Sequence, residues 1–105
     1  MKTITLALCL AIAALFAQPA FAHTAILKCS DNGDGTVFCE GGYSDGTPAG
    51  GTFMKLSDDD GKTILSGKMD NNGEFTFDKP DVHYTVVFDG GEGHQAEVDS
   101  NDIVE

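Results

Sequence analysis

The sequence predicts an all-β protein built as a sandwich or barrel of short strands. No segment after residue 22 repeats apolar residues at the spacing of an amphipathic helix. Short runs of β-branched and aromatic residues alternate instead with clusters of Asp, Asn and Gly. These turn signals recur about every 8–12 residues, a spacing that is typical of sandwiches and barrels.

Seven runs are the expected strands, namely residues 25–29, 36–43, 52–56, 62–68, 74–77, 82–89 and 94–98. A turn follows each of the first six, in which Gly supplies a positive φ and Asp or Asn bonds its own backbone two residues on. Neither the cluster around Gly35 nor the one around Gly61 has the glutamate that a calcium loop needs at its twelfth position. Both clusters are therefore predicted to be hairpin turns.

Alternation along the expected strands predicts the core, because successive residues of a strand point to opposite faces. A bulge in a strand would shift its assignment by one residue. The sets that share a face are Ala25, Leu27 and Cys29; Met54 and Leu56; Phe75 and Phe77; Val82, Tyr84, Val86 and Phe88; and His94, Ala96 and Val98.

Residues 1–22 have the three parts of a secretory signal peptide in the expected order. Lys2 supplies the positive charge, residues 4–16 are almost wholly apolar, and Ala20-Phe21-Ala22 is a small-x-small cleavage site. The apolar run is too short to span a bilayer. We therefore expect a periplasmic or secreted protein with no membrane anchor.

Cleavage before His23 would leave one mature domain, residues 23–105, and would remove Cys9. The two cysteines that stay, Cys29 and Cys39, predict a disulfide, since an even pair in a small exported chain usually forms one. A metal site with two thiolates is the alternative. It is disfavoured because zinc motifs usually place paired cysteines about two to four residues apart.

The charge balance excludes some partners. The chain has 17 acidic and 6 basic residues, all six of them lysines, and a formal net charge of -11. Nucleic-acid binding is not expected, because phosphate contacts depend on Lys and Arg. A strongly acidic surface instead attracts cations. We expect no enzyme, because the sequence has no nucleophile elbow, Walker loop or zinc-protease helix.

Part of the chain resembles a known family. The segment 39–51 reads Cys-Glu-Gly-Gly-Tyr-Ser-Asp-Gly-Thr-Pro-Ala-Gly-Gly and is similar to the entry of carboxypeptidase regulatory-like domains. The likeness continues through the turn at 58–61, the Asp-Asn-Asn-Gly-Glu-Phe-Thr-Phe run at 70–77, Pro80 and the Tyr-Thr-Val run at 84–86. This resemblance implies a seven-stranded prealbumin-like (transthyretin-like) Greek-key sandwich, a fold that serves many proteins as an accessory module.

The Gly-rich segment 88–94, Phe-Asp-Gly-Gly-Glu-Gly-His, departs from that family. It resembles small periplasmic proteins associated with bacterial nickel/cobalt uptake systems. This second resemblance implies a periplasmic protein of a Gram-negative bacterium. It also implies a membrane metal transporter, or another protein of the envelope, as the partner.

Cleavage before His23 would place a free α-amino group beside an imidazole on one residue. A second histidine would complete a set of three nitrogens, which suits Cu(II), Ni(II) or Co(II). His94 is the expected second ligand because it follows the Gly-rich loop, and His83 is the next candidate. The sequence thus predicts a non-enzymatic metal-handling protein. The alternatives are a metal-free module that docks another protein through an edge strand, and an enzyme with copper on its amino-terminal histidine.

Overall fold

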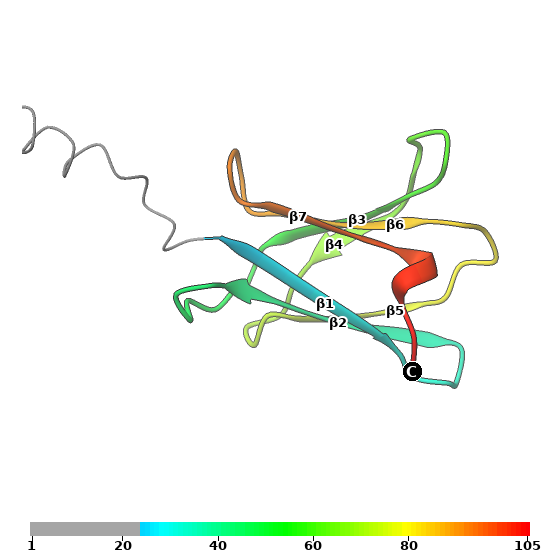
Figure 1. Ribbon diagram of the computed structural model, residues 1–105, viewed down its shortest axis with the longest axis horizontal. Coiled ribbons are helices and arrows are strands. Elements are labelled where there is room, and N and C mark those ends of the chain that lie inside the picture. The colour runs from blue at the N-terminus through cyan, green and yellow to red at the C-terminus, as the bar shows by residue number, and fades with distance from the viewer. Residues whose placement is uncertain (1–23) are drawn as a thin grey trace, which may run out of the picture.

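The computed structural model describes residues 24–105 (Figure 1). The predicted signal peptide and His23 lie outside the described residues. Within residues 24–105, seven strands are followed by one 3-10 helix, Ser100–Asp102. The strands are β1 Ala25–Asp31, β2 Thr36–Tyr43, β3 Phe53–Ser57, β4 Thr63–Lys68, β5 Glu74–Asp78, β6 Thr85–Asp89 and β7 Gln95–Asp99.

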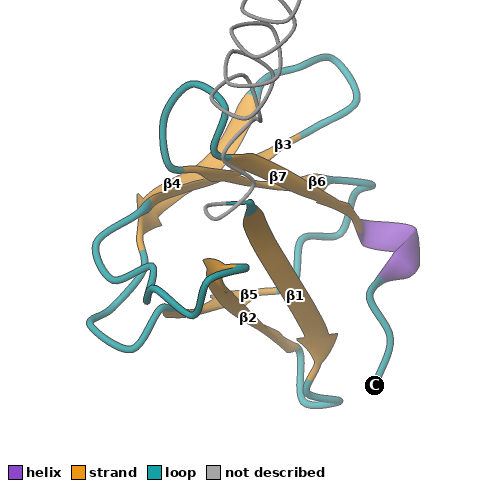
Figure 2. Cartoon of the chain, turned by 60° about the vertical axis from the view of Figure 1, so that its left-hand side comes forward, coloured by secondary structure: helices purple, strands orange, loops and turns teal. Residues whose placement is uncertain are grey.

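The strands form two antiparallel sheets that face each other, so the predicted all-β sandwich is confirmed (Figure 2). One sheet has three strands in the order β1-β2-β5, and the other has four in the order β4-β3-β6-β7. The edge strands β1 and β7 contact each other and close one side of the sandwich. Among the described residues, the three-stranded sheet has no fourth strand to lie opposite β4.

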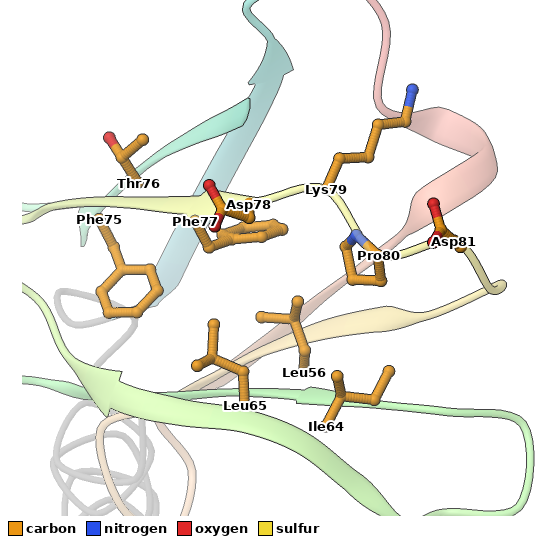
Figure 3. Close-up of a pocket in the computed structure, with 10 residues that line it drawn as sticks. All are labelled: Leu56, Ile64, Leu65, Phe75, Thr76, Phe77, Asp78, Lys79, Pro80 and Asp81. Atoms are coloured by element: carbon orange, nitrogen blue, oxygen red, sulfur yellow. The ribbon is translucent and has the colours of Figure 1, made fainter. Parts of the chain in front are cut away.

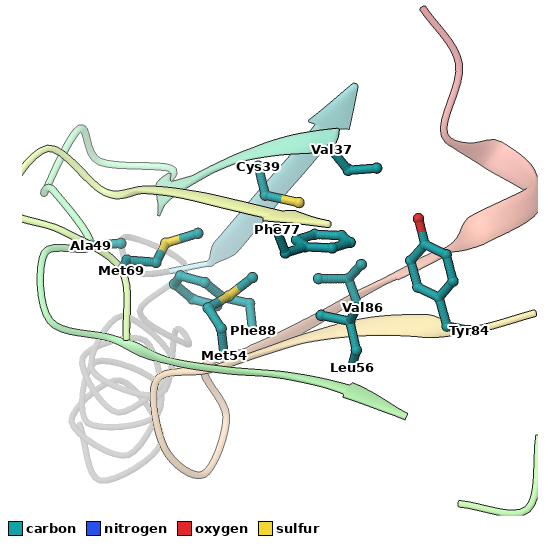
Figure 4. Packing of buried hydrophobic residues seen from close by; sticks show 10 residues of the cluster. All are labelled: Val37, Cys39, Ala49, Met54, Leu56, Met69, Phe77, Tyr84, Val86 and Phe88. Atoms are coloured by element: carbon teal, nitrogen blue, oxygen red, sulfur yellow. The ribbon is translucent and has the colours of Figure 1, made fainter. Parts of the chain in front are cut away.

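The core lies between the two sheets and is wholly apolar (Figure 4). Alternation predicted most of it correctly, since the expected inward residues of β3 and β6 are buried. Val82 was assigned wrongly and is 57% exposed. The buried cluster is Val37, Cys39, Ala49, Met54, Leu56, Met69, Phe77, Tyr84, Val86 and Phe88.

The predicted disulfide between Cys29 and Cys39 is present. These residues are cross-strand partners in the β1–β2 hairpin, with a Cα–Cα distance of 4.0 Å. Such a short separation belongs to an antiparallel pair that exchanges no backbone hydrogen bonds. The bond indicates an oxidising compartment outside the cytoplasm.

The predicted acidic turns at 31–35, 45–51, 58–61 and 70–73 are present, and Asp89 and Asp99 form two more that were not predicted. Seven aspartates each accept a hydrogen bond from the backbone amide two residues on, through Oδ1 at 2.8–3.0 Å. This is the Asx turn, in which the side chain replaces a backbone acceptor. The aspartates are Asp31, Asp34, Asp45, Asp58, Asp70, Asp89 and Asp99.

The sixth strand begins at Thr85, not at Val82 as predicted. After β5 the chain must cross from the three-stranded sheet to the four-stranded one, and residues 79–84 make this crossing. Pro80 has no amide to donate to a ladder. The amide of Tyr84 donates to Ser100 Oγ at 3.1 Å, so it is bonded outside the sheet. The apolar run therefore extends further than the strand.

Candidate functional site

His94 lies at the end of the hairpin that joins β6 to β7. Its amide donates to the Gly91 carbonyl and its carbonyl accepts from the Gly90 amide, both at 2.9 Å. Asp89 Oδ1 closes the same turn by accepting from the Gly91 amide at 3.0 Å and from Gln95 Nε2 at 3.2 Å. The Gly91 amide, followed by the Gln95 side chain, lowers the pKa of Asp89 below its ordinary value.

The half-buried imidazole of His94 packs edge-to-face on the ring of Tyr43, with 5.9 Å between centroids and an interplanar angle of 87°. Tyr43 in turn packs on buried Phe88 at 5.9 Å. Gly90 makes room for this arrangement, because a Cβ atom there would collide with the Tyr43 hydroxyl. The histidine is thus positioned by the last residue of β2 and by the core.

The first described residue lies at this same end of the sandwich. The carbonyl of Thr24 accepts from the Ser44 amide at 2.9 Å, and the Thr24 amide donates to Ser44 Oγ at 3.2 Å. Ala25 is the register partner of Tyr43, whose ring contacts His94. The start of β1 and the β6–β7 hairpin are therefore neighbouring features, as Figure 1 also shows.

His83 occupies a different place. Its Nδ1 is bonded to Oδ1 of Asp59, and its Nε2 lies 2.9 Å from Oδ1 of Asp99. The ring thereby joins the crossing before β6 to the β3–β4 turn and to the end of β7. The hydrogen bond to Asp59, and then that to Asp99, raise the pKa of His83 above its ordinary value of 6.5.

The structure does not bring His83 and His94 together. The whole of β6 separates them, and five residues of extended strand span roughly 15 Å. Within residues 24–105 no three His, Cys, Asp or Glu side chains gather closely enough to hold a metal ion. Both cysteines of residues 24–105 are in the disulfide. A metal site at His94 accordingly needs a donor from outside these residues.

Sequence reasoning missed the partners of both rings. Asp59 belongs to a run of three aspartates that was assigned only to a turn, and Asp99 follows the last expected strand. Nothing local marks either one as a partner of His83. Nor does the sequence around Tyr43 mark it as the residue on which His94 packs.

Fold and site together define a class: a small, acidic β-sandwich stapled by one disulfide. In sequence, the chain is similar to an uncharacterised protein of Haemophilus influenzae, with 35% identity over 94 residues that cover 82% of this chain and 55% of the relative. The chain thus spans about half the length of that relative. No family model and no solved structure matches this chain. Residues 24–105 contain no helix of the length and apolar character needed to cross a membrane.

Proposed function

We propose that this protein is an exported, non-enzymatic metal-handling accessory protein that binds Ni(II), Co(II) or Cu(II). The ligands in this proposal are the amino group and imidazole of His23, set free by cleavage, and the imidazole of His94. The observation that carries it is the position of Thr24. This residue follows His23 directly in the chain and is bonded to Ser44, next to the tyrosine on which His94 packs.

The chemistry of the donors supports a transition metal. An amino group and imidazoles are nitrogen donors, and the affinity of nitrogen sites for divalent ions rises through Co, Ni and Cu. Calcium and magnesium prefer oxygen ligands. The aspartates of the turns are also already bonded to backbone amides, which fits a structural role for them.

The charge supports a handling role. A formal net charge of -11 raises the local concentration of cations around the molecule. A protein that concentrates and holds such ions is suited to pass them to a membrane metal transporter. We include this partner in the proposal, together with membership of the carboxypeptidase regulatory-like group, which the two-sheet fold supports in its coarse features.

Calorimetry tests the ligand set. Ni(II) and Cu(II) are titrated into the exported protein, into the same protein with its amino group acetylated, and into His94→Gln. Each change is expected to weaken binding at least tenfold. His83→Gln is the matched control, because it removes an imidazole at the other end of β6, and it is expected to bind the metal as the parent does. Equal affinity in the parent, the acetylated protein and His94→Gln would remove the proposed site.

A metal-free module that docks another protein is the second candidate function. A specific observation favours it, namely an open apolar groove between β4 and β5. The two functions do not exclude each other, because the groove and His94 lie in different parts of the sandwich. A protein that gives no heat with either metal but binds a partner in the groove would belong to this second class.

A further inference from the structure

An apolar groove of about 570 Å³ runs between the edges of the two sheets (Figure 3). The end of β4 and the start of β5 lie close together beside the turn that joins them. A Cβ on Gly67 would lie 2.7 Å from the ring of Phe75 there. Away from this turn the two strands diverge. The apolar lining is Leu56, Ile64, Leu65, Phe75, Phe77 and Pro80.

The groove lies where a fourth strand of the three-stranded sheet would pair with β5. Because the sheets contain three and four strands and β1 lies against β7, the shorter sheet ends at β5 while the other continues to β4. In the part of the chain that the structure describes, no strand therefore lies opposite the inner face of β4. Ile64 is left 41% exposed and Leu65 39% exposed.

A β-bulge in β4 turns the side chains of both Ile64 and Leu65 toward the groove. Leu56 pairs with Leu65 and Ser57 pairs with Thr63, so Ile64 is an extra residue in β4. A bulge disrupts the ladder locally and redirects a side chain. The outer edge of β4 is thus a poor template for another strand, whereas the inner side gains a second apolar residue.

The edge of β5 is regular, and the register gives the direction of its backbone groups. Cys39 exchanges no backbone bonds with Cys29, so its amide and carbonyl point toward Phe75 of β5. Alternation then directs the amides and carbonyls of Thr76 and Asp78 away from β2, to the open edge. No other described strand pairs with β5 there.

The charge at this edge is negative. Asp78 and Asp81 line the groove, and neither carboxylate has an ion-pair partner within residues 24–105. The lysine between them does not neutralise them, because Lys79 Nζ is bonded to Asp31 at 2.7 Å. A segment that lies along this edge therefore meets two free carboxylates.

We propose that the edge of β5 binds an extended segment of a partner protein as a fourth strand of the shorter sheet. The segment alternates apolar with polar residues and carries Lys or Arg beside Asp78 and Asp81. Its backbone bonds to Thr76 and Asp78, and its apolar side chains cover Ile64, Leu65 and Phe75. A second copy of this chain is a poor occupant, because two molecules of charge -11 repel each other.

The probe is an eight-residue peptide that alternates valine and threonine between two terminal lysines. Its binding to the exported protein is followed by amide chemical shifts in NMR. We expect the amides of Thr76 and Asp78 to shift and to become protected from hydrogen exchange. Replacing the terminal lysines by glutamates, or N-methylating alternate peptide residues, is expected to weaken binding at least tenfold.

Thr76→Pro is the sharpest variant, since proline is tolerated where an edge amide faces solvent and removes that donor. It is expected to lose at least tenfold in peptide affinity with an unchanged melting temperature. Val82→Ser, at an exposed position outside the groove lining, is the matched control and is expected to bind as the parent does. Three results would overturn the proposal: no binding at millimolar peptide, shifts confined to other strands, or a dimer of this chain joined through β5.

Discussion

Nε2 of His83 lies 2.9 Å from Oδ1 of Asp99, a residue 16 positions further along the chain. The other ring nitrogen is bonded to Asp59, in the turn between β3 and β4. One side chain thus ties three segments together at the end of the sandwich opposite His94. Each nitrogen meets a different carboxylate, an arrangement that holds an imidazolium in place and does not form a metal chelate.

Stability is expected to depend on pH through this histidine. The pKa of His83 is raised in the folded state, first by Asp59 and then by Asp99. Its contribution is therefore fully present below about pH 6.5, and it is lost as the pH rises through the folded-state pKa. The pKa of Asp99 is lowered, first by the Asn101 amide and then by His83, so its contribution is lost as the pH falls below 3.8.

Denaturant unfolding at a series of pH values measures this dependence. The parent is expected to lose stability between pH 6 and pH 9, and His83→Gln is expected to flatten the curve over that range. His94→Gln is the comparison, since it removes a histidine at the other end of β6. An identical slope in the parent and His83→Gln would show that the ion pairs add nothing to folding.

The disulfide is expected to be a major source of stability in so small a domain. Cys29 and Cys39 are separated by 10 positions, and closing a loop of this size in the unfolded chain is worth about 3 kcal/mol in the chain-entropy model. Reduction of the parent should lower the free energy of unfolding by about that amount. The double variant Cys29→Ala/Cys39→Ala should have about the same free energy of unfolding as the reduced parent, and reductant should not change it.

Substitution of two glycines by alanine distinguishes the cost of a positive φ from the cost of a steric clash at the added Cβ. Gly73 and Gly46 both have positive φ, at 74° and 85°. A Cβ on Gly73 would lie 2.6 Å from the Gly41 carbonyl oxygen, whereas one on Gly46 would meet nothing within 4 Å. Gly46→Ala is expected to cost about 1 kcal/mol and Gly73→Ala about 2–3 kcal/mol. Thermal unfolding of both variants checks the order, and equal losses would contradict the close contact.

The turn between β4 and β5 depends on one carboxylate. Asp70 Oδ1 accepts from the Asn72 amide at 2.8 Å and from the Glu74 amide at 3.0 Å. Asp70→Ala is expected to destabilise the fold by about 1–2 kcal/mol, since both donors lose their acceptor. Asp70→Asn keeps an oxygen acceptor and should lose much less stability than Asp70→Ala. Chemical denaturation of both variants measures the difference. A similar loss in both variants would mean that charge, not the acceptor, stabilises the turn.

The proposed metal site and the proposed docking edge can be tested independently of each other. His94 lies at the β6–β7 hairpin, whereas Leu56, in the groove, pairs with Val86 near the start of β6. Thr76→Pro should therefore leave metal binding unchanged. His94→Gln should in the same way leave peptide binding unchanged. Loss of both activities in either variant would indicate a folding defect.

The sequence by itself determined the elements that depend on local chemistry. Turns with Asp at their first position and Gly two or three residues on were predicted where the structure has them, because these side chains act on their own backbone. The inward positions of Met54 and Leu56 were predicted correctly because successive residues of a strand point to opposite faces. The Cys29–Cys39 disulfide was predicted correctly because these are the only two cysteines after residue 22. The boundary at Thr85 was not, since Val82 belongs to an apolar run that continues beyond the ladder.

Only the tertiary structure decided which distant residues meet. The order of strands within each sheet places Asp59 and Asp99 on either side of His83, 24 and 16 positions away, and it leaves β4 without a strand opposite. The same order puts the start of β1 beside the hairpin of His94. Strand order follows from how apolar faces are buried together across the whole chain, and a segment of a few residues carries no information about it.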